Sequence, residues 1–192
     1  MSHPLWRSVF GNARPVEIEI GPGRGDVIIA FARAYPGVNF FGVEAQRWYA
    51  ARAQARAERL GLANVRVIAA DARCVLRHLV PDASVHAVHV YFPDPWPKKR
   101  HGKRRLFSPA FAEELRRVLV TGGVVYVATD LADVFALMRN SLLSAGFTPD
   151  RAVPARTRPV TRFEEKYAAS GTFQGAFRAP LVRAARSPQP AS

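Results

Sequence analysis

The stretch "VEIEIGPGRGD", residues 16–26, gives the first indication of the fold. It joins an apolar segment of strand length to a turn in which Gly21, Gly23 and Gly25 alternate with other residues. Glycine adopts backbone conformations closed to other residues and lets the backbone approach a ligand closely. A strand that runs through such a turn into a helix is typical of the first unit of a nucleotide-binding α/β protein. The same spacing also fits an ordinary tight turn, so the rest of the chain must decide.

Further apolar runs of strand length follow, and segments of helical length separate them. The runs are "VNFFGVE" (38–44), "NVRVIAAD" (64–71), "VHAVHVYF" (85–92) and "GVVYVATD" (123–130). Between them, residues 45–61 predict a helix that ends at Gly61, and residues 108–119 predict one that begins with Ser108 as N-cap and Pro109 in its first turn. Connections of this length favour a parallel sheet with right-handed crossovers.

The composition indicates one domain and a polyanionic partner. The chain has 192 residues, of which 48% are hydrophobic, and we expect a single domain over 1–186 and a disordered tail over 187–192. A formal charge of +13 suits a nucleic-acid phosphate backbone. An anionic membrane is the rival partner, but the longest uncharged apolar run, about 118–129, is too short to span a bilayer. We therefore expect no membrane partner.

Cysteine and histidine usage exclude two classes of site. Cys74 is the single cysteine, so no internal disulfide can form, and this indicates a cytoplasmic protein. Its apolar helical surroundings predict a small core residue and not a nucleophile. The five histidines lack metal-ligand spacing, and we expect no metal.

Acidic residues recur where the predicted strands end, and these ends meet at one edge of a parallel sheet. They are Glu19, Glu44, Asp71, Asp94 and Asp130. Such a pocket suits a positively charged ligand that is rich in hydroxyl and amino donors, and not a phosphate.

This ligand is better predicted as S-adenosylmethionine (SAM) than as NAD. Glu44 can accept both hydrogens of a ribose diol, which fits either cofactor. NAD favours the spacing G-x-G-x-x-G, whereas the third glycine here comes one residue early and Asp26 follows it, where it would repel a pyrophosphate. SAM carries an ammonium and a sulfonium, which favour carboxylates such as Glu19. Asp71 could accept the adenine amino group, although it could equally be a helix N-cap.

A second decisive stretch is "YFPDPWPKKRHGKRRL", residues 91–106. Pro93 and Pro95 restrict the backbone around Asp94. Trp96 could stack on a base or pack against the prolines. The basic run that follows is either a solvated surface or an anchor for RNA phosphates, and its position beside the acid of the fourth strand favours the anchor.

These segments together resemble the bacterial tRNA (guanine-N7)-methyltransferases, a family of Rossmann-like SAM-dependent enzymes. The resemblance covers about 16–178 and rests on the stretch 91–106, on "RPVTRFEEKY" (158–167) and on more widely shared motifs such as "FFGVEAQ" and "VATD". It implies a mostly parallel seven-stranded sheet with helices on both faces. It also implies tRNA as the partner, and either a monomer or a homodimer.

The resemblance also assigns roles to residues. The expected cofactor site is Glu19, Gly21, Gly23, Glu44, Asp71, Ala72 and Asp94, with Asp94 also as the catalytic residue. The expected contacts with the target nucleotide are Lys98, Asp130, Thr161, Arg162, Phe163 and Glu164, and the expected RNA contacts are Arg100, His101, Lys103, Arg104 and Arg105. The spacing of Thr161 and Glu164 fits a capping box of a helix over 163–169 as well.

Three other functions stay open on the residues alone. "PDPW" (93–96) is similar to the D-P-P-W motif of methyltransferases that act on exocyclic amino groups. An NAD-dependent oxidoreductase is disfavoured by the glycine spacing. A non-catalytic RNA-binding protein on the same scaffold would require the acids at the strand ends to be incidental.

Overall fold

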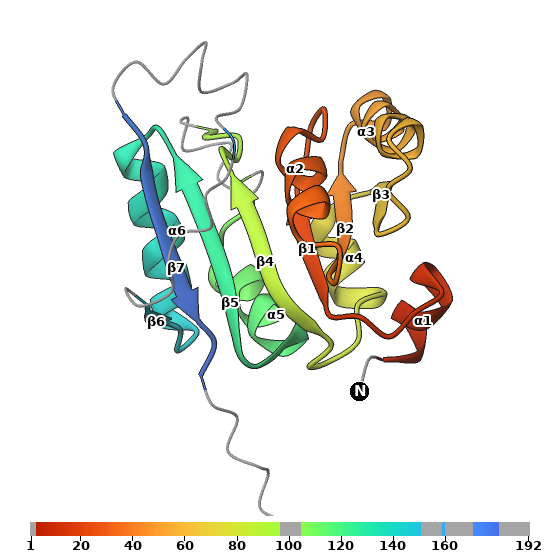
Figure 1. Cartoon of the computed structure of the whole chain (residues 1–192). Coiled ribbons are helices and arrows are strands. Elements are labelled where there is room, and N and C mark those ends of the chain that lie inside the picture. Colours follow the sequence, from red (N-terminus) through yellow and green to blue (C-terminus); the bar gives the residue numbers. More distant parts are fainter. Residues whose placement is uncertain (1–2, 97–104, 151–158, 160–170, 181–192) are drawn as a thin grey trace, which may run out of the picture.

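The computed structural model describes residues 3–96, 105–150, 159 and 171–180, and it contains a seven-stranded sheet (Figure 1). The strands are β1 (Val16–Ile20), β2 (Asn39–Glu44), β3 (Val65–Ala69), β4 (Val85–Tyr91), β5 (Leu119–Thr129), β6 (Thr148–Pro149) and β7 (Phe173–Arg178). Their order is β3-β2-β1-β4-β5-β7-β6. The first five strands pair in parallel, and β7 is antiparallel to β5 and to β6. The predicted mostly parallel sheet is confirmed.

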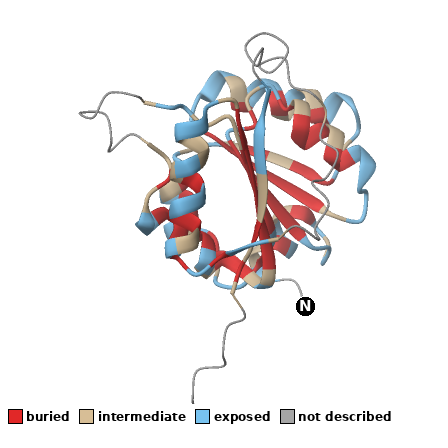
Figure 2. Ribbon diagram, turned by 90° about the vertical axis from the view of Figure 1, so that its left-hand side faces the viewer, coloured by how far each residue is buried: buried red, intermediate tan, exposed pale blue. Residues whose placement is uncertain are grey.

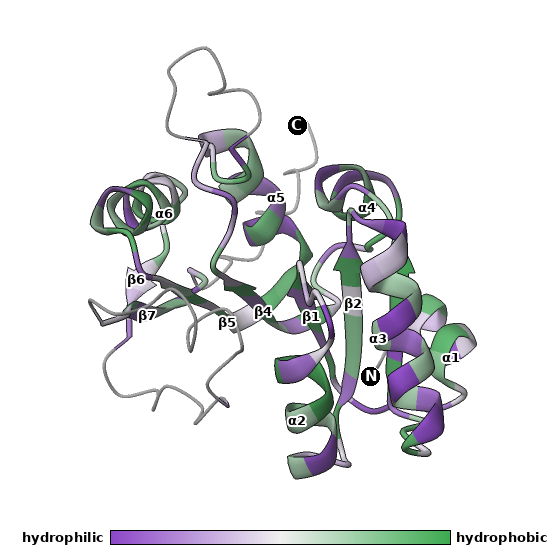
Figure 3. Cartoon of the chain, turned by 90° about the horizontal axis from the view of Figure 1, so that it is seen from above, coloured by the Kyte–Doolittle hydropathy of each residue, from purple (hydrophilic) through white to green (hydrophobic). Residues whose placement is uncertain are grey.

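Helices cover both faces of this sheet (Figure 3). They are α1 (Pro4–Phe10), α2 (Asp26–Ala34), α3 (Arg47–Arg59), α4 (Ala72–His78), α5 (Pro109–Val118) and α6 (Ala132–Ser144). Two apolar clusters correspond to the two layers of helices. One contains residues of α2 and α3 with β2 and β3, and the other contains residues of α1, α4, α5 and α6 with the central strands. Buried residues line the sheet and the inward helix faces, and exposed residues lie outside (Figure 2).

The central strands are buried on both faces, as parallel strands covered by helices must be. Ile18, Val88 and Val125, on three neighbouring strands, belong to the same core cluster and are fully buried. The helix boundaries follow the predicted signals. The Ser108 hydroxyl accepts the Phe111 N–H at 3.2 Å at the start of α5, and Gly61, just beyond α3, has a φ of 66°.

Three features differ from the sequence-based expectation. α1 was not predicted, yet its Trp6 is buried in the main core and its ring meets Phe41 edge-on, with the centroids 5.4 Å apart. β5 begins at Leu119, four residues before the predicted start at 123. Cys74 is exposed and not in the core, because the neighbouring Val75 and Leu76 form the inward face of α4. The expected helix over 163–169 and the tail over 187–192 lie outside the described residues.

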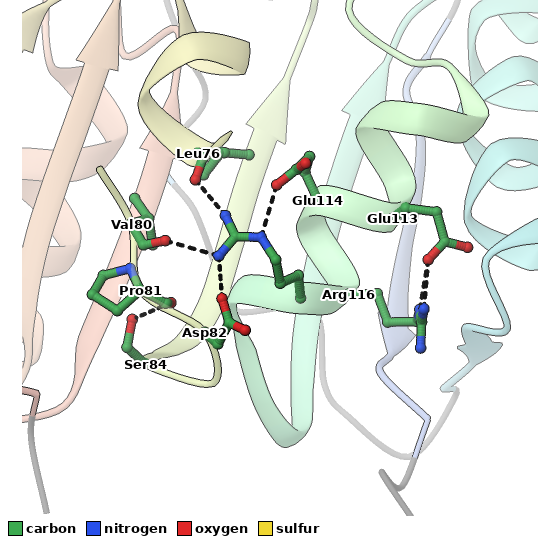
Figure 4. Close-up of polar contacts among 9 residues, drawn as sticks. Leu76, Val80, Pro81, Asp82, Ser84, Glu113, Glu114 and Arg116 are labelled. Atoms are coloured by element: carbon green, nitrogen blue, oxygen red, sulfur yellow. Dashed lines mark hydrogen bonds and ion pairs between the residues drawn. The ribbon is translucent and has the colours of Figure 1, made fainter. Parts of the chain in front are cut away.

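Arg117, on α5, ties that helix to α4 and to the loop that follows α4 (Figure 4). Its guanidinium donates to the carbonyls of Leu76 at 2.5 Å and Val80 at 3.1 Å, and it also pairs with Asp82 and Glu114. Burial alone would lower the pKa of Arg117, but the hydrogen bonds and charges of Asp82 and Glu114 leave it raised. The planar fork of arginine is what allows one side chain to reach acceptors in several directions.

We predict that Arg117→Ala lowers the free energy of unfolding by about 2 kcal/mol, because it removes charge-assisted hydrogen bonds and leaves two carbonyls without this donor. Arg116→Ala is the matched control. Arg116 is on the same helix but pairs with Glu113 at an exposed position, so its loss should cost less than about 0.5 kcal/mol. Urea denaturation of both variants checks this, and equal losses would contradict the bracing role of Arg117.

Candidate active site

The predicted site residues that the structure describes lie near one edge of the sheet, at or just beyond the carboxyl ends of the strands. The chain runs outward from β1 to β2 and β3 in one direction and from β4 to β5 in the other, so the order reverses between β1 and β4. Ligands of such sheets bind in the crevice at this switch point. The turn after β1, Glu44 at the end of β2, and the loops after β4 and β5 all lie along this edge (Figure 1).

The glycine turn after β1 is held by Glu44 from the next strand. Gly21 and Gly23 have φ values of 71° and 54°, in the left-handed region that favours glycine. The Gly23 N–H donates to Glu44 Oε2 at 3.0 Å. Gly25 starts α2 with a φ of 81°, and a Cβ there would lie 3.1 Å from the Cβ of Ala53 on α3. The turn therefore packs closely between β2 and α3.

Glu44 is suited to hold the ribose of SAM. Its side chain is buried, and Oε1 accepts the Gln46 N–H at 2.9 Å while Oε2 accepts from Gly23. An ionised carboxylate has about four lone-pair sites. Two of them fix the carboxylate toward the glycine turn, and the others can accept ribose hydroxyls. The remaining acceptor sites of Glu44 therefore fit the ribose of the cofactor predicted from the sequence.

The remaining predicted cofactor residues differ in their surroundings. Glu19 is buried within β1, in register with Gly42 of β2 and His89 of β4. Asp71 is exposed, and its Oδ1 accepts the N–H groups of Arg73 at 2.7 Å and Cys74 at 3.3 Å. Asp71 is thus the N-cap of α4, as the alternative interpretation held, and Ala72 is the first residue of that helix. Their contacts with a cofactor stay a prediction.

Asp26 weakens one argument made from the sequence. Its Oδ1 is 2.6 Å from the guanidinium Nη1 of Arg56 on α3, so its charge is partly compensated. It would repel a pyrophosphate less than the sequence alone indicates. The glycine spacing is therefore the feature that disfavours NAD as the cofactor.

The loop that carries Asp94 has an unusual backbone. Phe92 and Trp96 have φ values of 49° and 40°, a region that residues other than glycine rarely adopt. The Phe92 N–H donates to the Ala128 carbonyl of β5 at 2.8 Å, which fixes the start of the loop. Asp94 is exposed between Pro93 and Pro95. Strain of this kind costs about 1–3 kcal/mol per residue and is common at functional sites.

Arg105 links the two described residues that flank the basic segment 97–104 in the sequence, itself and Trp96. Its Nε donates to the Trp96 carbonyl at 3.1 Å, and its own carbonyl accepts from Arg73 Nη2 at 2.7 Å. The sequence predicts Arg105 as an RNA contact, but the side chain also has this structural role. The backbone of Trp96 has a structural role as well, and stacking of its ring on a base stays a prediction.

Asp130 comes from the strand beside the Asp94 loop. It directly follows β5 and is half-buried. Tyr91, at the end of β4, is in register with Ala128 of β5, so the segments that lead to Asp94 and to Asp130 are neighbours. The structure thus brings these two acids to the same part of the edge.

Several predicted residues lie outside the described part of the chain. They are Lys98, Arg100, His101, Lys103, Arg104, Thr161, Arg162, Phe163 and Glu164.

Within residues 3–96, 105–150, 159 and 171–180, no group of three His, Cys, Asp or Glu residues could hold a metal ion. None of the helices in those ranges is long and apolar enough to cross a membrane.

An apolar cavity of about 370 Å³ lies elsewhere, beside α1 and α4. Trp6, Phe41, Val75 and Val80 are among the residues that line it, and none of the predicted site residues does so. The strand-end carboxylates are therefore the better candidate for the active site.

Comparison with known proteins identifies the family. Residues 13–174 match the family described as "Putative methyltransferase". The chain is also 38% identical over 188 residues to the tRNA (guanine-N(7)-)-methyltransferase of Myxococcus xanthus (strain DK1622), an alignment that covers 95% of this chain and 90% of that protein. The chain belongs to the tRNA (guanine-N7)-methyltransferase family. It is therefore an enzyme, and its methyl donor is SAM.

Solved structures agree on the fold. The aminoglycoside resistance methyltransferase NpmB1 superposes with a TM-score of 0.62 at 17% identity, and 91% of each chain is covered. A SAM-dependent methyltransferase from Aquifex aeolicus gives a TM-score of 0.58 at 14% identity, with 92% of this chain and 94% of that chain covered. The Rossmann-like methyltransferase fold predicted from the sequence is confirmed.

We predict that Glu44→Ala lowers SAM affinity at least tenfold, because it removes a charged acceptor from the ribose and releases the glycine turn. Glu44→Gln, which keeps one carbonyl acceptor, should have an intermediate affinity. Isothermal titration calorimetry measures the binding, and thermal melting shows whether each variant is folded. Glu58→Gln, an exposed acid on α3, is the control. A folded Glu44→Ala variant with unchanged affinity would remove Glu44 from the cofactor site.

Proposed function

We propose that this enzyme transfers the methyl group of SAM to N7 of a guanine in the variable loop of tRNA. Asp94 and Asp130 orient the base, and Asp94 is the catalytic residue. The observation that carries the proposal is the convergence of the Asp94 loop and Asp130 on the edge where Glu44 holds the glycine turn. The name of the Myxococcus xanthus relative and the basic segment beside Asp94 support tRNA as the substrate.

The chemistry makes modest demands on the protein. When bound, SAM supplies a methyl group on a sulfonium, and the in-plane N7 lone pair of guanine can take it without any proton leaving the base. No strong base is needed, so the protein contributes orientation and electrostatics. A carboxylate that accepts from the N1–H and amino edge of guanine holds the ring and stabilises the positive charge that it gains. Asp94, fixed between two prolines, can do this with little loss of entropy.

The direct test uses methyl-labelled SAM and unmodified tRNA. We expect label in the tRNA, and we expect reduction followed by aniline to cleave the chain at the labelled nucleotide in the variable loop, since this treatment is specific for 7-methylguanosine. Label without cleavage would place the methyl group on another atom. Absence of label, with SAM bound normally, would contradict the assigned substrate.

We predict that Asp94→Asn abolishes transfer while SAM affinity falls less than threefold. The amide keeps the shape of the side chain but removes the charge that stabilises a cationic base. Single-turnover kinetics measures transfer, and calorimetry measures SAM binding. If both activities fell equally, Asp94 would belong to the cofactor site and not to the acceptor site.

We predict that replacing Lys103 and Arg104 together by alanine weakens tRNA binding and reduces its salt dependence. Each phosphate contact that is lost lowers the slope of log K against log salt by about one. Arg105 is left intact because its side chain donates to the Trp96 carbonyl. Arg33→Ala with Arg59→Ala is the matched control, since both arginines are exposed at the ends of α2 and α3, at the opposite edge of the sheet. An unchanged slope in the first variant would remove the RNA anchor.

A further inference from the structure

A carboxylate and an imidazole form a pair in the interior of the sheet. Glu17 of β1 and His89 of β4 are 3% and 0% exposed, and Glu17 Oε2 lies 2.8 Å from His89 Nε2. Neither residue is among those that the sequence predicts to contact the cofactor or the acceptor. A buried carboxylate is costly without a hydrogen-bonding partner, so the buried Glu17 needs a partner such as His89.

The second nitrogen of the imidazole extends the chain to Tyr91. His89 Nδ1 lies 2.8 Å from the Tyr91 hydroxyl. The His89 ring also stacks on Tyr126 of β5, with the centroids 4.9 Å apart and the planes 5° from parallel, and it contacts Phe31 of α2. Contacts from two neighbouring elements therefore hold the imidazole in one orientation.

The direction of the hydrogen bonds follows from the carboxylate. If Glu17 is ionised it can only accept, so Nε2 of His89 carries a proton. In the neutral imidazole, Nδ1 then accepts the hydroxyl proton of Tyr91, and in the charged imidazole it donates to the phenol oxygen. Both states keep the chain from Glu17 to Tyr91 intact. The Tyr91 hydroxyl is thus fixed in position, as is the imidazole ring of His89.

Tyr91 is the last residue of β4, directly before the strained turn that leads to Asp94. Phe92 follows it with a φ of 49°, and Asp94 is two residues further. A backbone held in this region requires its surroundings to over-determine it. The phenol bond holds Tyr91, and the bond from the Phe92 N–H to Ala128 holds the next residue, so both fix the start of the turn.

We propose that Glu17 and His89 are positioning residues that act through Tyr91 to set the Asp94 loop. This inference rests on the proposed role of Asp94 in methyl transfer. A displacement of about 1 Å at a reacting group can cost about a hundredfold in rate. Loss of the chain should therefore reduce the rate of transfer more than it reduces the binding of either substrate.

Tyr91→Phe is the sharpest test, because it removes one hydroxyl and keeps the ring. We expect kcat to fall about tenfold, while KM for tRNA, the Kd for SAM and the melting temperature change little. Ile18→Val, on the opposite face of β1, is the control for a small loss of core stability, and its kcat should be unchanged. Wild-type kcat in Tyr91→Phe, or a fall that appears only in KM, would overturn the proposal.

Substitutions of His89 separate positioning from packing. His89→Gln can still donate to Glu17 and accept from Tyr91, so it should recover part of kcat, whereas His89→Leu should lose kcat as far as Tyr91→Phe does or further. A double-mutant cycle of Glu17→Gln and Tyr91→Phe should be non-additive in kcat, because the two side chains communicate through one imidazole. Additive effects, or equal losses in the glutamine and leucine variants, would contradict the chain.

The outcome for Asp94 distinguishes the two proposals. If Asp94→Asn is inactive and Tyr91→Phe behaves as wild type, only the positioning chain fails. If Asp94→Asn is active, the proposed catalytic role of Asp94 is wrong. The positioning chain is then wrong as well, because a loss of kcat in Tyr91→Phe could not come from displacement of Asp94.

Discussion

The carboxylate of Glu44 is the constraint on which the site depends. It is buried at the end of β2, and it accepts hydrogen bonds from the glycine turn after β1 and from Gln46, just before α3. Burial of a charge is tolerated only where hydrogen bonds compensate for it. The side chain that we predict to contact the cofactor therefore also fixes the glycine turn beside it. This is why the spacing of the glycines and the position of Glu44 carry more information together than separately.

The protein as a whole is basic, yet its predicted cofactor site is acidic. The net charge of +13 attracts a polyanion, yet acids lie at or near the carboxyl ends of the parallel strands. The positive charge suits the phosphate backbone, and the carboxylates suit a cationic cofactor and the hydrogen-bond donors of a base. In the sequence the Asp94 loop directly precedes the basic run, and Arg105, after that run, donates to the carbonyl of Trp96.

Much of this arrangement could be predicted from the sequence because it depends on local patterns. The apolar runs predicted β1 to β5 and the Ser108 cap predicted the start of α5, whereas the cofactor site at the glycine turn and Glu44 stays a prediction. Other features depend on contacts between distant segments. The α1 helix is stabilised by packing of Trp6 on Phe41, and Cys74 faces outward because of the orientation of α4. The pairing of Asp26 with Arg56 likewise depends on how α2 and α3 meet.

The pair of Glu17 and His89 shows where a signal was present but ambiguous. Glu17 and Glu19 alternate along β1, which places both on one face of the sheet, and only the pairing of β1 with β4 reveals that His89 contacts Glu17. The positive φ of Phe92 and of Trp96 had no signal, because both residues ordinarily avoid that region.

A crystal structure of the enzyme with tRNA and S-adenosylhomocysteine, the product left after transfer, would show the acceptor base and the cofactor together. We predict that the ribose hydroxyls contact Glu44, that the N1–H and amino edge of the guanine contacts Asp94 or Asp130, and that N7 faces the sulfur. A guanine whose amino group faces the sulfur, or a cofactor bound away from Glu44, would contradict this prediction.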